Sequence, residues 1–212
     1  MRNALLSFSW MPFLALLLFT AQPAETPVPA TNEATSYEAT SYEVDKSHSE
    51  VGFKVRHLGI ANVRGSFGDY EATLAMDGND LSTLTATATI QVASIDTGIE
   101  RRDGHLRSDD FFSAETYPTI TFESTSVRNI DGEEFELVGN LTIKGVTKEV
   151  VLEAEFLGTG MMRDTKKAGF SAETEIDRFD FNLQWDNKTA DNVLIVDDTI
   201  KIELELEMNA TS

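Results

Sequence analysis

Apolar and polar residues alternate with a period of two along most of the chain after Tyr42, the pattern of a β-strand with one buried face. The clearest case is the last segment, where every second residue from Ile200 to Met208 is apolar and Lys or Glu stands between them. About eight such segments follow one another through hairpin-length links such as Asp131-Gly132, which predicts an all-β antiparallel sandwich or barrel.

Three places interrupt the alternation. The phase reverses at Gly68, between Phe67 and Tyr70, which predicts a bulge that bends one strand. Residues 158–167 are predicted to form a polar loop. Residues 179–185 alternate again in the opposite phase and are predicted to form a strand.

A charged insert between Ile99 and Phe122 breaks the pattern completely. Ser108, followed by two aspartates, resembles a helix N-cap, and Pro118 must end any helix before Thr119. We therefore expect one or two short helical turns that close one end of the β-structure.

The N-terminal residues have a different character. Residues 1–21 resemble an export signal, because Arg2 precedes an apolar run and small residues follow it; an uncleaved membrane anchor is the alternative. Residues 22–41 are rich in proline, small and acidic residues and are predicted to be a disordered linker, so that the folded domain spans 42–209. The expected location is periplasmic or secreted, and since the chain has no cysteine, the fold must be stable without disulfides.

The interior of an eight-stranded barrel is just wide enough to be filled by side chains or to hold one slender ligand. Small residues at inward positions would leave room along part of the axis: Gly65, Ala72, Ala86, Ala88 and Ala172. Periodicity alone leaves a ligand-holding barrel and a packed barrel open.

Six sequence blocks, in order between Tyr42 and Met208, resemble the YceI family of exported, lipocalin-like polyisoprenoid-binding proteins. They are His48-Ser49-x-Val51-x-Phe53-x-Val55-x-His57-Leu58-Gly59, Ser94 to Gly98, Arg102 to Phe112, Tyr117 to Phe122, Leu141 to Thr147, and Arg178-x-Asp180-Phe181. The resemblance implies an eight-stranded antiparallel lipocalin-like barrel with a short helical insert near one end and an isoprenoid-tailed lipid inside. Asn182 departs from the family, which often has glycine there.

The inward pattern and the resemblance together predict which residues contact the ligand. The apolar wall is predicted to comprise Val51, Phe53, Val55, His57, Phe67, Leu74, Ile90, Phe111, Phe112, Ile120, Phe122, Phe170, Phe181, Trp185 and Leu204. For Arg102, His105 and Arg107 two roles remain open: a salt-bridged lid, or contacts to an anionic or quinone head group near the barrel mouth.

Other chemistries find little support in the sequence. The three histidines have no metal-binding spacing, so no metal site is expected. No nucleophile motif is present, and no catalytic residues are predicted. No cofactor is expected beyond a bound isoprenoid lipid or quinone.

The net charge of −19 argues against nucleic acid and anionic membrane surfaces as partners. We expect a carrier that binds and sequesters or transports a polyprenyl or quinone-like lipid, without stable membrane insertion of the mature protein, and a homodimer remains open. The alternatives are an enzyme acting on such a lipid and a filled-core structural module.

Overall fold

The computed structural model describes residues 39–211, which contain eleven strands, one α-helix and two 3-10 helices. The predicted export signal and all but the last residues of the predicted linker lie outside this range. The first strand begins at Thr40, two residues before the predicted start of the domain. The elements are β1 (Thr40–Val44), β2 (Glu50–His57), β3 (Ala61–Phe67), β4 (Tyr70–Asp77), β5 (Asp80–Gln91), η1 (Val92–Ser94), β6 (Ile95–Asp96), α1 (Glu100–Arg107), β7 (Thr119–Asp131), β8 (Glu134–Ile143), β9 (Val146–Met162), β10 (Thr165–Asp177), η2 (Arg178–Phe181) and β11 (Val196–Thr211).

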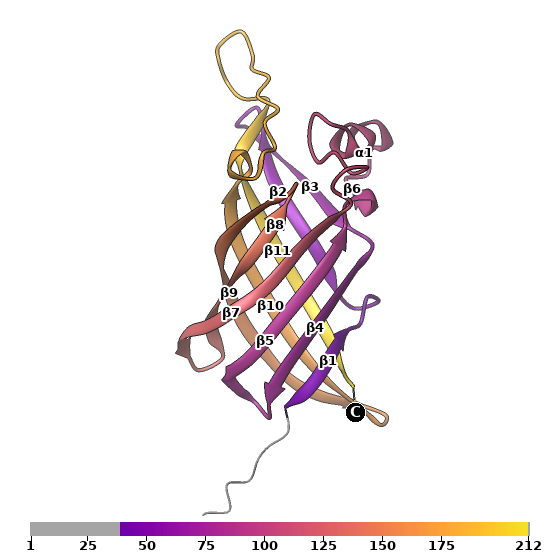
Figure 1. The fold of residues 1–212 in the computed structure, drawn as a ribbon, viewed down its shortest axis with the longest axis vertical. Helices are drawn as coiled ribbons and strands as arrows, with labels where there is room; N and C mark the ends of the chain where they lie inside the picture. Colours follow the sequence, from indigo (N-terminus) through magenta and orange to yellow (C-terminus); the bar gives the residue numbers. More distant parts are fainter. Residues whose placement is uncertain (1–38, 212) are drawn as a thin grey trace, which may run out of the picture. The chain divides into compact units, whose positions relative to one another are not determined.

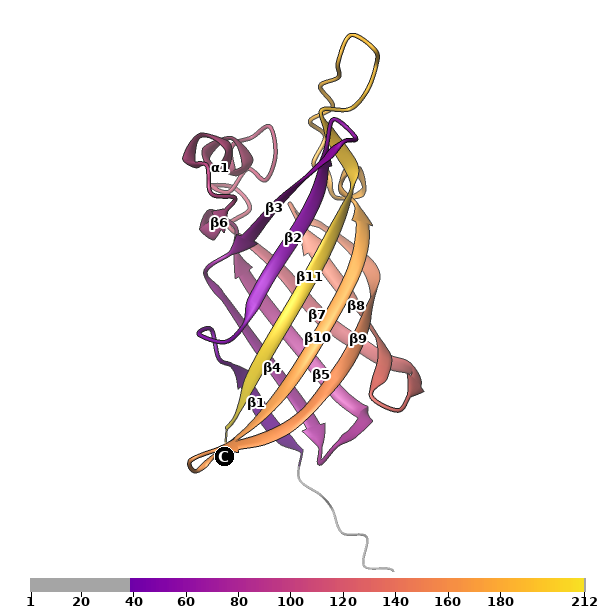
Figure 2. The same ribbon diagram turned by 180° about the vertical axis from the view of Figure 1, so that it is seen from behind.

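The strands close into an antiparallel barrel (Figures 1 and 2). β1, β4, β5, β7, β8, β9, β10 and β11 follow one another around the sheet, and β11 pairs with β1 to close it. β1 and β2 pair with successive parts of β11. β4 and β3 in turn pair with β1 and β2. β6 likewise continues β5 beyond η1 and pairs with β3. The three interrupted pairs therefore each count as one staggered strand, and the predicted eight-stranded barrel is confirmed.

The predicted phase reversal at Gly68 separates β3 from β4. There the chain changes partners: β3 pairs with β2 and with the short β6, whereas β4 pairs with β1 and β5. Backbone bonds hold the joint, because Gly68 N donates to Ser94 O (3.2 Å) and Gln91 N donates to Asp69 O (2.8 Å). The bend thus lets the sheet close at one end around β6 and the helical insert.

Two ends of the barrel can be distinguished in Figure 1. One, called the α1 end below, carries the insert with α1, the β2–β3 turn and the long connection of residues 182–195. The opposite end carries the β4–β5 and β9–β10 turns and the C-terminus of β11.

Three local predictions are wrong. Ser108 does not begin a helix: α1 precedes it, and Ser108 N donates to His105 O (3.2 Å) at the helix C-terminus. Residues 158–167 are mostly strand, because their backbone groups pair across the β9–β10 hairpin whatever their polarity. Residues 179–185 form η2 and a loop instead of a strand; Asn182 there adopts a left-handed conformation (φ 59°), which glycine or asparagine tolerates best.

The interior contains two apolar clusters. The cluster at the opposite end is built on Tyr42, Met76, Phe156, Phe170 and Met208, which are all buried. The cluster at the α1 end includes Val51, Phe67, Ile120, Ile176 and Phe181. Phe122 and Leu204 pack against both clusters and mark the boundary between them.

Candidate ligand-binding cavity

The α1-end half of the barrel encloses a cavity of about 180 Å³ whose wall is almost entirely apolar. The insert contributes Leu106, Phe111 and Phe112 to this wall, and the strands contribute the rest. The structure brings together ten residues of the predicted ligand set around it: Val51, Phe53, Val55, Phe67, Ile90, Phe111, Phe112, Ile120, Phe122 and Leu204.

Ala72 and Ala88 create space in the wall. They face each other across β4 and β5, and both line the cavity. Gly65 does not leave room in this way, because a methyl group there would lie 2.5 Å from Cζ of Phe53, whose ring covers the glycine. Ala86 and Ala172 pack against the cluster at the opposite end. The barrel is therefore hollow in one half and packed in the other.

The remaining residues of the predicted wall do not line the cavity. Leu74 and Phe170 belong to the packed cluster, where the Phe170 ring centroid lies 5.1 Å from that of Phe156. Phe181 is buried beside the cavity in the α1-end cluster without lining it, and His57 is half-buried at the end of β2. Trp185 packs against the insert, with its ring centroid 5.4 Å from that of Phe111.

The three insert residues of the predicted ligand set, Arg102, His105 and Arg107, have partners within the protein and do not line the cavity. Arg102 donates from Nε to Thr97 Oγ1 (2.6 Å) and from Nη2 to Thr97 O (2.7 Å). His105 Nε2 lies 2.8 Å from Asp110 Oδ2, and Arg107 donates from Nη2 to a Glu100 carboxylate oxygen at 2.7 Å. The contacts of His105 and Arg107 are those expected of a salt-bridged lid, whereas Arg102 is bonded to a threonine.

A buried carboxylate fixes the insert on the barrel. Asp103 accepts hydrogen bonds through Oδ1 from Thr97 N (2.9 Å) and Thr97 Oγ1 (2.5 Å). Because Thr97 also accepts from Arg102, one residue of the β6–α1 link joins two side chains of the helix. The apolar residues Leu106, Phe111 and Phe112 are thereby held against the cavity.

Several cavity residues are absent from the predicted ligand set. Most of them occupy inward positions that the same alternation identifies: Leu141, Ile143, Val150, Leu152, Ile176, Ile200, Ile202 and Leu206. Arg178 is different, because a buried arginine cannot be recognised from periodicity.

Arg178 is the one charged side chain among the described residues that line the cavity. It is 1% exposed and donates to three backbone carbonyls, those of Leu183 (2.6 Å), Asp197 (2.8 Å) and Val196 (3.0 Å). Burial lowers the pKa of Arg178, and nearby aspartates, Asp198 first among them, oppose that shift. The guanidinium therefore ties the start of the 182–195 connection to the start of β11.

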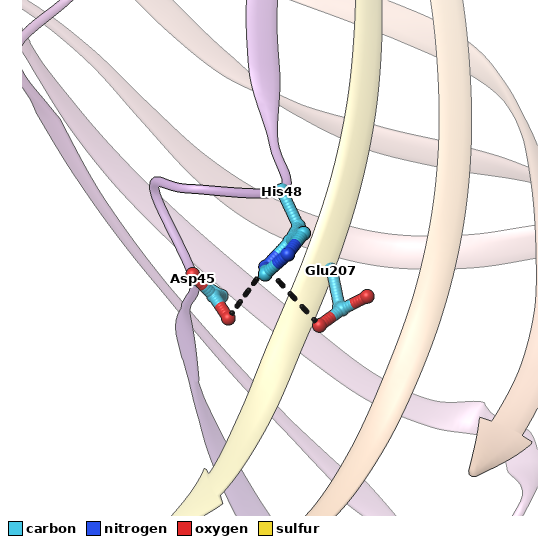
Figure 3. Close-up of side chains that lie close together, drawn as sticks. All are labelled: Asp45, His48 and Glu207. Carbon is cyan, nitrogen blue, oxygen red and sulfur yellow. Dashed lines mark hydrogen bonds and ion pairs between the residues drawn. The ribbon is translucent and has the colours of Figure 1, made fainter. Parts of the chain in front are cut away.

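A second polar cluster lies at the joint between β1 and β2 (Figure 3). His48 Nδ1 lies 3.1 Å from Asp45 Oδ2 and 3.7 Å from Glu207 Oε1. Lys167 Nζ lies 2.8 Å and 2.5 Å from the same two oxygens. The hydrogen bonds from Lys167 and His48 hold the pKa of Asp45 well below its usual range, and Asp45 and Glu207 raise the pKa of Lys167.

These contacts favour a structural role for the cluster. A metal ion bound by Asp45, His48 and Glu207 would compete with an ammonium group that already neutralises the same carboxylate oxygens. The cluster instead connects the β1–β2 joint to β10 and β11.

Among residues 39–211 no helix is long and apolar enough to cross a membrane.

Comparisons with known proteins agree with this architecture. A sequence profile described as the YceI-like domain matches residues 42–208. "Protein YceI" of Escherichia coli O157:H7 is 42% identical over 151 residues, which cover 70% of this chain and 78% of that protein. The crystal structure of a Campylobacter jejuni YCEI protein is similar with a TM-score of 0.65 at 38% identity, covering 80% of this chain and 97% of that one. A polyisoprenoid binding domain from Saccharophagus degradans has the same fold, with a TM-score of 0.60 at 16% identity over 80% of this chain and 98% of that one. The resemblance and the fold predicted from the sequence are thus confirmed.

Proposed function

The chain belongs to the YceI-like family, and we propose that it is a carrier that binds an isoprenoid-type lipid, polyprenyl or quinone-like, in the α1-end half of its barrel. The observation that carries the proposal is the apolar cavity enclosed by the barrel and the insert. The name of the Saccharophagus degradans domain, which binds polyisoprenoid, supports the choice of ligand class. Export to the periplasm or beyond is part of the proposal and is motivated by residues 1–21.

The driving force is the transfer of apolar groups out of water. Each buried methylene contributes about 0.8 kcal/mol, so ten of them provide roughly 8 kcal/mol before the costs of association are subtracted. No polar contact to the tail is needed for tight binding. The cavity of about 180 Å³ is smaller than the ~300–1,000 Å³ of typical ligand pockets, so a long tail must displace side chains of the wall.

The wall supports a carrier over an enzyme. Arg178, its one charged side chain among the described residues, is bonded to backbone carbonyls, and the polar groups of the insert bond to one another outside the cavity. An acid or base positioned to react with a lipid would have to point into the cavity.

Mass spectrometry of organic extracts from detergent-free preparations tests the proposal. We expect an isoprenoid lipid or quinone at up to one molecule per chain. Ala88→Leu, which fills part of the cavity, should reduce that amount. Ala86, two residues earlier on β5, packs against the cluster of the packed half. Ala86→Leu should therefore destabilise the protein without a selective loss of lipid per folded chain. Extracts free of lipid, together with no binding of added polyprenols, would refute the proposal.

A further inference from the structure

Three large aliphatic side chains are exposed in the connections at the α1 end. Ile60 in the β2–β3 turn is 84% exposed, Ile99 just before α1 is 51% exposed, and Val193 in the 182–195 connection is 43% exposed. Figures 1 and 2 show that these three connections project from the same end of the barrel. We refer to Ile60, Ile99 and Val193 as the apolar rim.

The apolar rim and the cavity wall belong to the same parts of the chain. The insert that follows Ile99 supplies Leu106 and Phe112 to the wall, and the connection that carries Val193 is flanked by the wall residues Leu183 and Val196. The cavity therefore lies directly behind the segments that expose the rim.

The opposite end offers a lipid no comparable route. Tyr42, Met76 and Met208 are fully or almost fully buried there, in the cluster that fills the interior. A lipid that reached the cavity from that side would have to pass through a packed core, which has interior density close to that of an organic crystal. Entry at the α1 end requires displacement of the insert or the 182–195 connection alone.

The charge of the protein indicates what kind of surface the rim fits. With a net charge of −19, the chain is repelled by anionic surfaces, so attraction by the rim must be apolar and not electrostatic. Isolated exposed apolar residues are ordinary on protein surfaces. Three of them at one end, in front of an apolar cavity, are suited to shallow insertion into the interface of a bilayer.

We propose that the apolar rim docks on the surface of a bilayer with neutral head groups, and that lipid passes between this bilayer and the cavity at the α1 end. The inference rests on the proposed lipid-carrier function and adds to it a docking surface and a direction of entry.

The test compares two triple variants. The rim variant is Ile60→Ser, Ile99→Ser, Val193→Ser. The control variant is Leu157→Ser, Met161→Ser, Met162→Ser, which removes side chains of similar exposure (56%, 67% and 55%) near the β9–β10 turn at the opposite end. Both sets of residues are exposed, so both variants should fold, and thermal unfolding checks this.

Two measurements are made with phosphatidylcholine vesicles. Flotation measures docking, and the rate at which geranylgeraniol moves from the vesicles to the protein measures transfer. We expect the rim variant to lose most of its flotation and at least tenfold in transfer rate, while the control variant matches the unmodified protein. Replacing a third of the phosphatidylcholine by phosphatidylglycerol should weaken flotation of all three proteins.

The amount of geranylgeraniol bound at equilibrium from dilute ethanol solution separates the two proposals. If all three proteins bind it equally and only the rim variant transfers it slowly, both proposals hold. If binding is normal but the two variants transfer at the same rate, or the control variant is the slower one, the docking proposal is overturned and the carrier function is not. If none of the proteins binds it, the isoprenoid ligand is refuted, and flotation alone still decides whether the rim docks.

Discussion

Phe122 lies at the boundary between the hollow and the packed half of the barrel, so its truncation distinguishes a ligand wall from a core. Its ring lines the cavity and covers Gly139, and on the neighbouring strands it faces Ala88 and Leu141. In a filled core, Phe→Ala costs about 3–5 kcal/mol, because a ring is lost and a void remains. Here one side of the ring already borders empty space and has fewer contacts to lose. We therefore expect the lipid-free Phe122→Ala variant to lose no more than about 2 kcal/mol of unfolding free energy.

Phe170→Ala is the matched control. Phe170 is buried in the packed cluster against Phe156, and it does not line the cavity. Its truncation should cost the full ~3–5 kcal/mol of a core phenylalanine. Lipid retention by the folded protein should be unchanged.

Denaturant unfolding of delipidated protein and lipid analysis of untreated protein measure the two effects separately. For Phe122→Ala we expect about a tenfold weaker retention of lipid, which corresponds to ~1.4 kcal/mol of lost ligand contacts. A destabilisation of ~3–5 kcal/mol with normal lipid content would mean that Phe122 is a core residue. A small loss of unfolding free energy in Phe170→Ala, together with loss of lipid, would mean that the cavity extends into the packed half.

Three further changes test other parts of the structure. Tyr42→Phe removes a buried hydroxyl without a hydrogen-bond partner among the described residues and should leave the unfolding free energy unchanged or raise it by up to about 1 kcal/mol; a clear loss would contradict this. Asp45→Asn should lower the thermal midpoint at pH 7. Since the pKa of Asp45 is depressed in the folded protein, its stabilisation is present above its ordinary pKa, and the difference between variant and unmodified protein should shrink as the pH falls below about 4. Arg178→Met leaves three carbonyls without their donor and should cost more than about 3 kcal/mol in denaturant unfolding; a cost near zero would show that the guanidinium does not hold the 182–195 connection.

Alternation of apolar and polar residues was sufficient to predict the barrel, because inward positions along a strand are shielded from water and outward positions contact it. It found the bend at Gly68, where the inward phase reverses. It failed at residues 179–185, where apolar residues alternate but the backbone turns through η2 and the left-handed Asn182. The backbone of this segment is held by Arg178, which donates to the carbonyls of Leu183 and Val196. These two residues are far from each other in the sequence and come together only in the folded chain.

The division of the interior could not be predicted from inward positions alone. Gly65 and Ala88 both resemble gaps in the sequence, yet the Phe53 ring fills the first and the second borders the cavity. The register pairs each small residue with an aromatic one, Gly65 with Phe53 and Ala88 with Phe122. The Phe53 ring lies over Gly65, whereas the Phe122 ring lies over Gly139 on the next strand, and the sequence does not reveal this difference in ring direction. In the same way, the alternation does not distinguish Phe170 from Phe122: both are inward phenylalanines, but Phe170 is buried in the packed cluster and Phe122 lines the cavity at the boundary.

This division also explains how a barrel without disulfides can contain a cavity. Empty space removes dispersion contacts from the residues around it, so a barrel hollow along its whole length would lose much of the packing that stabilises it. Here the closely packed cluster around Tyr42, Phe156 and Met208 stabilises one half, and the other half can remain open. The same cluster forms the floor of the cavity, which ends at Leu152 and Leu206. A ligand that enters at the α1 end therefore meets a limit to its depth, and a tail too long for the space above that floor must fold back or displace wall residues such as Phe122.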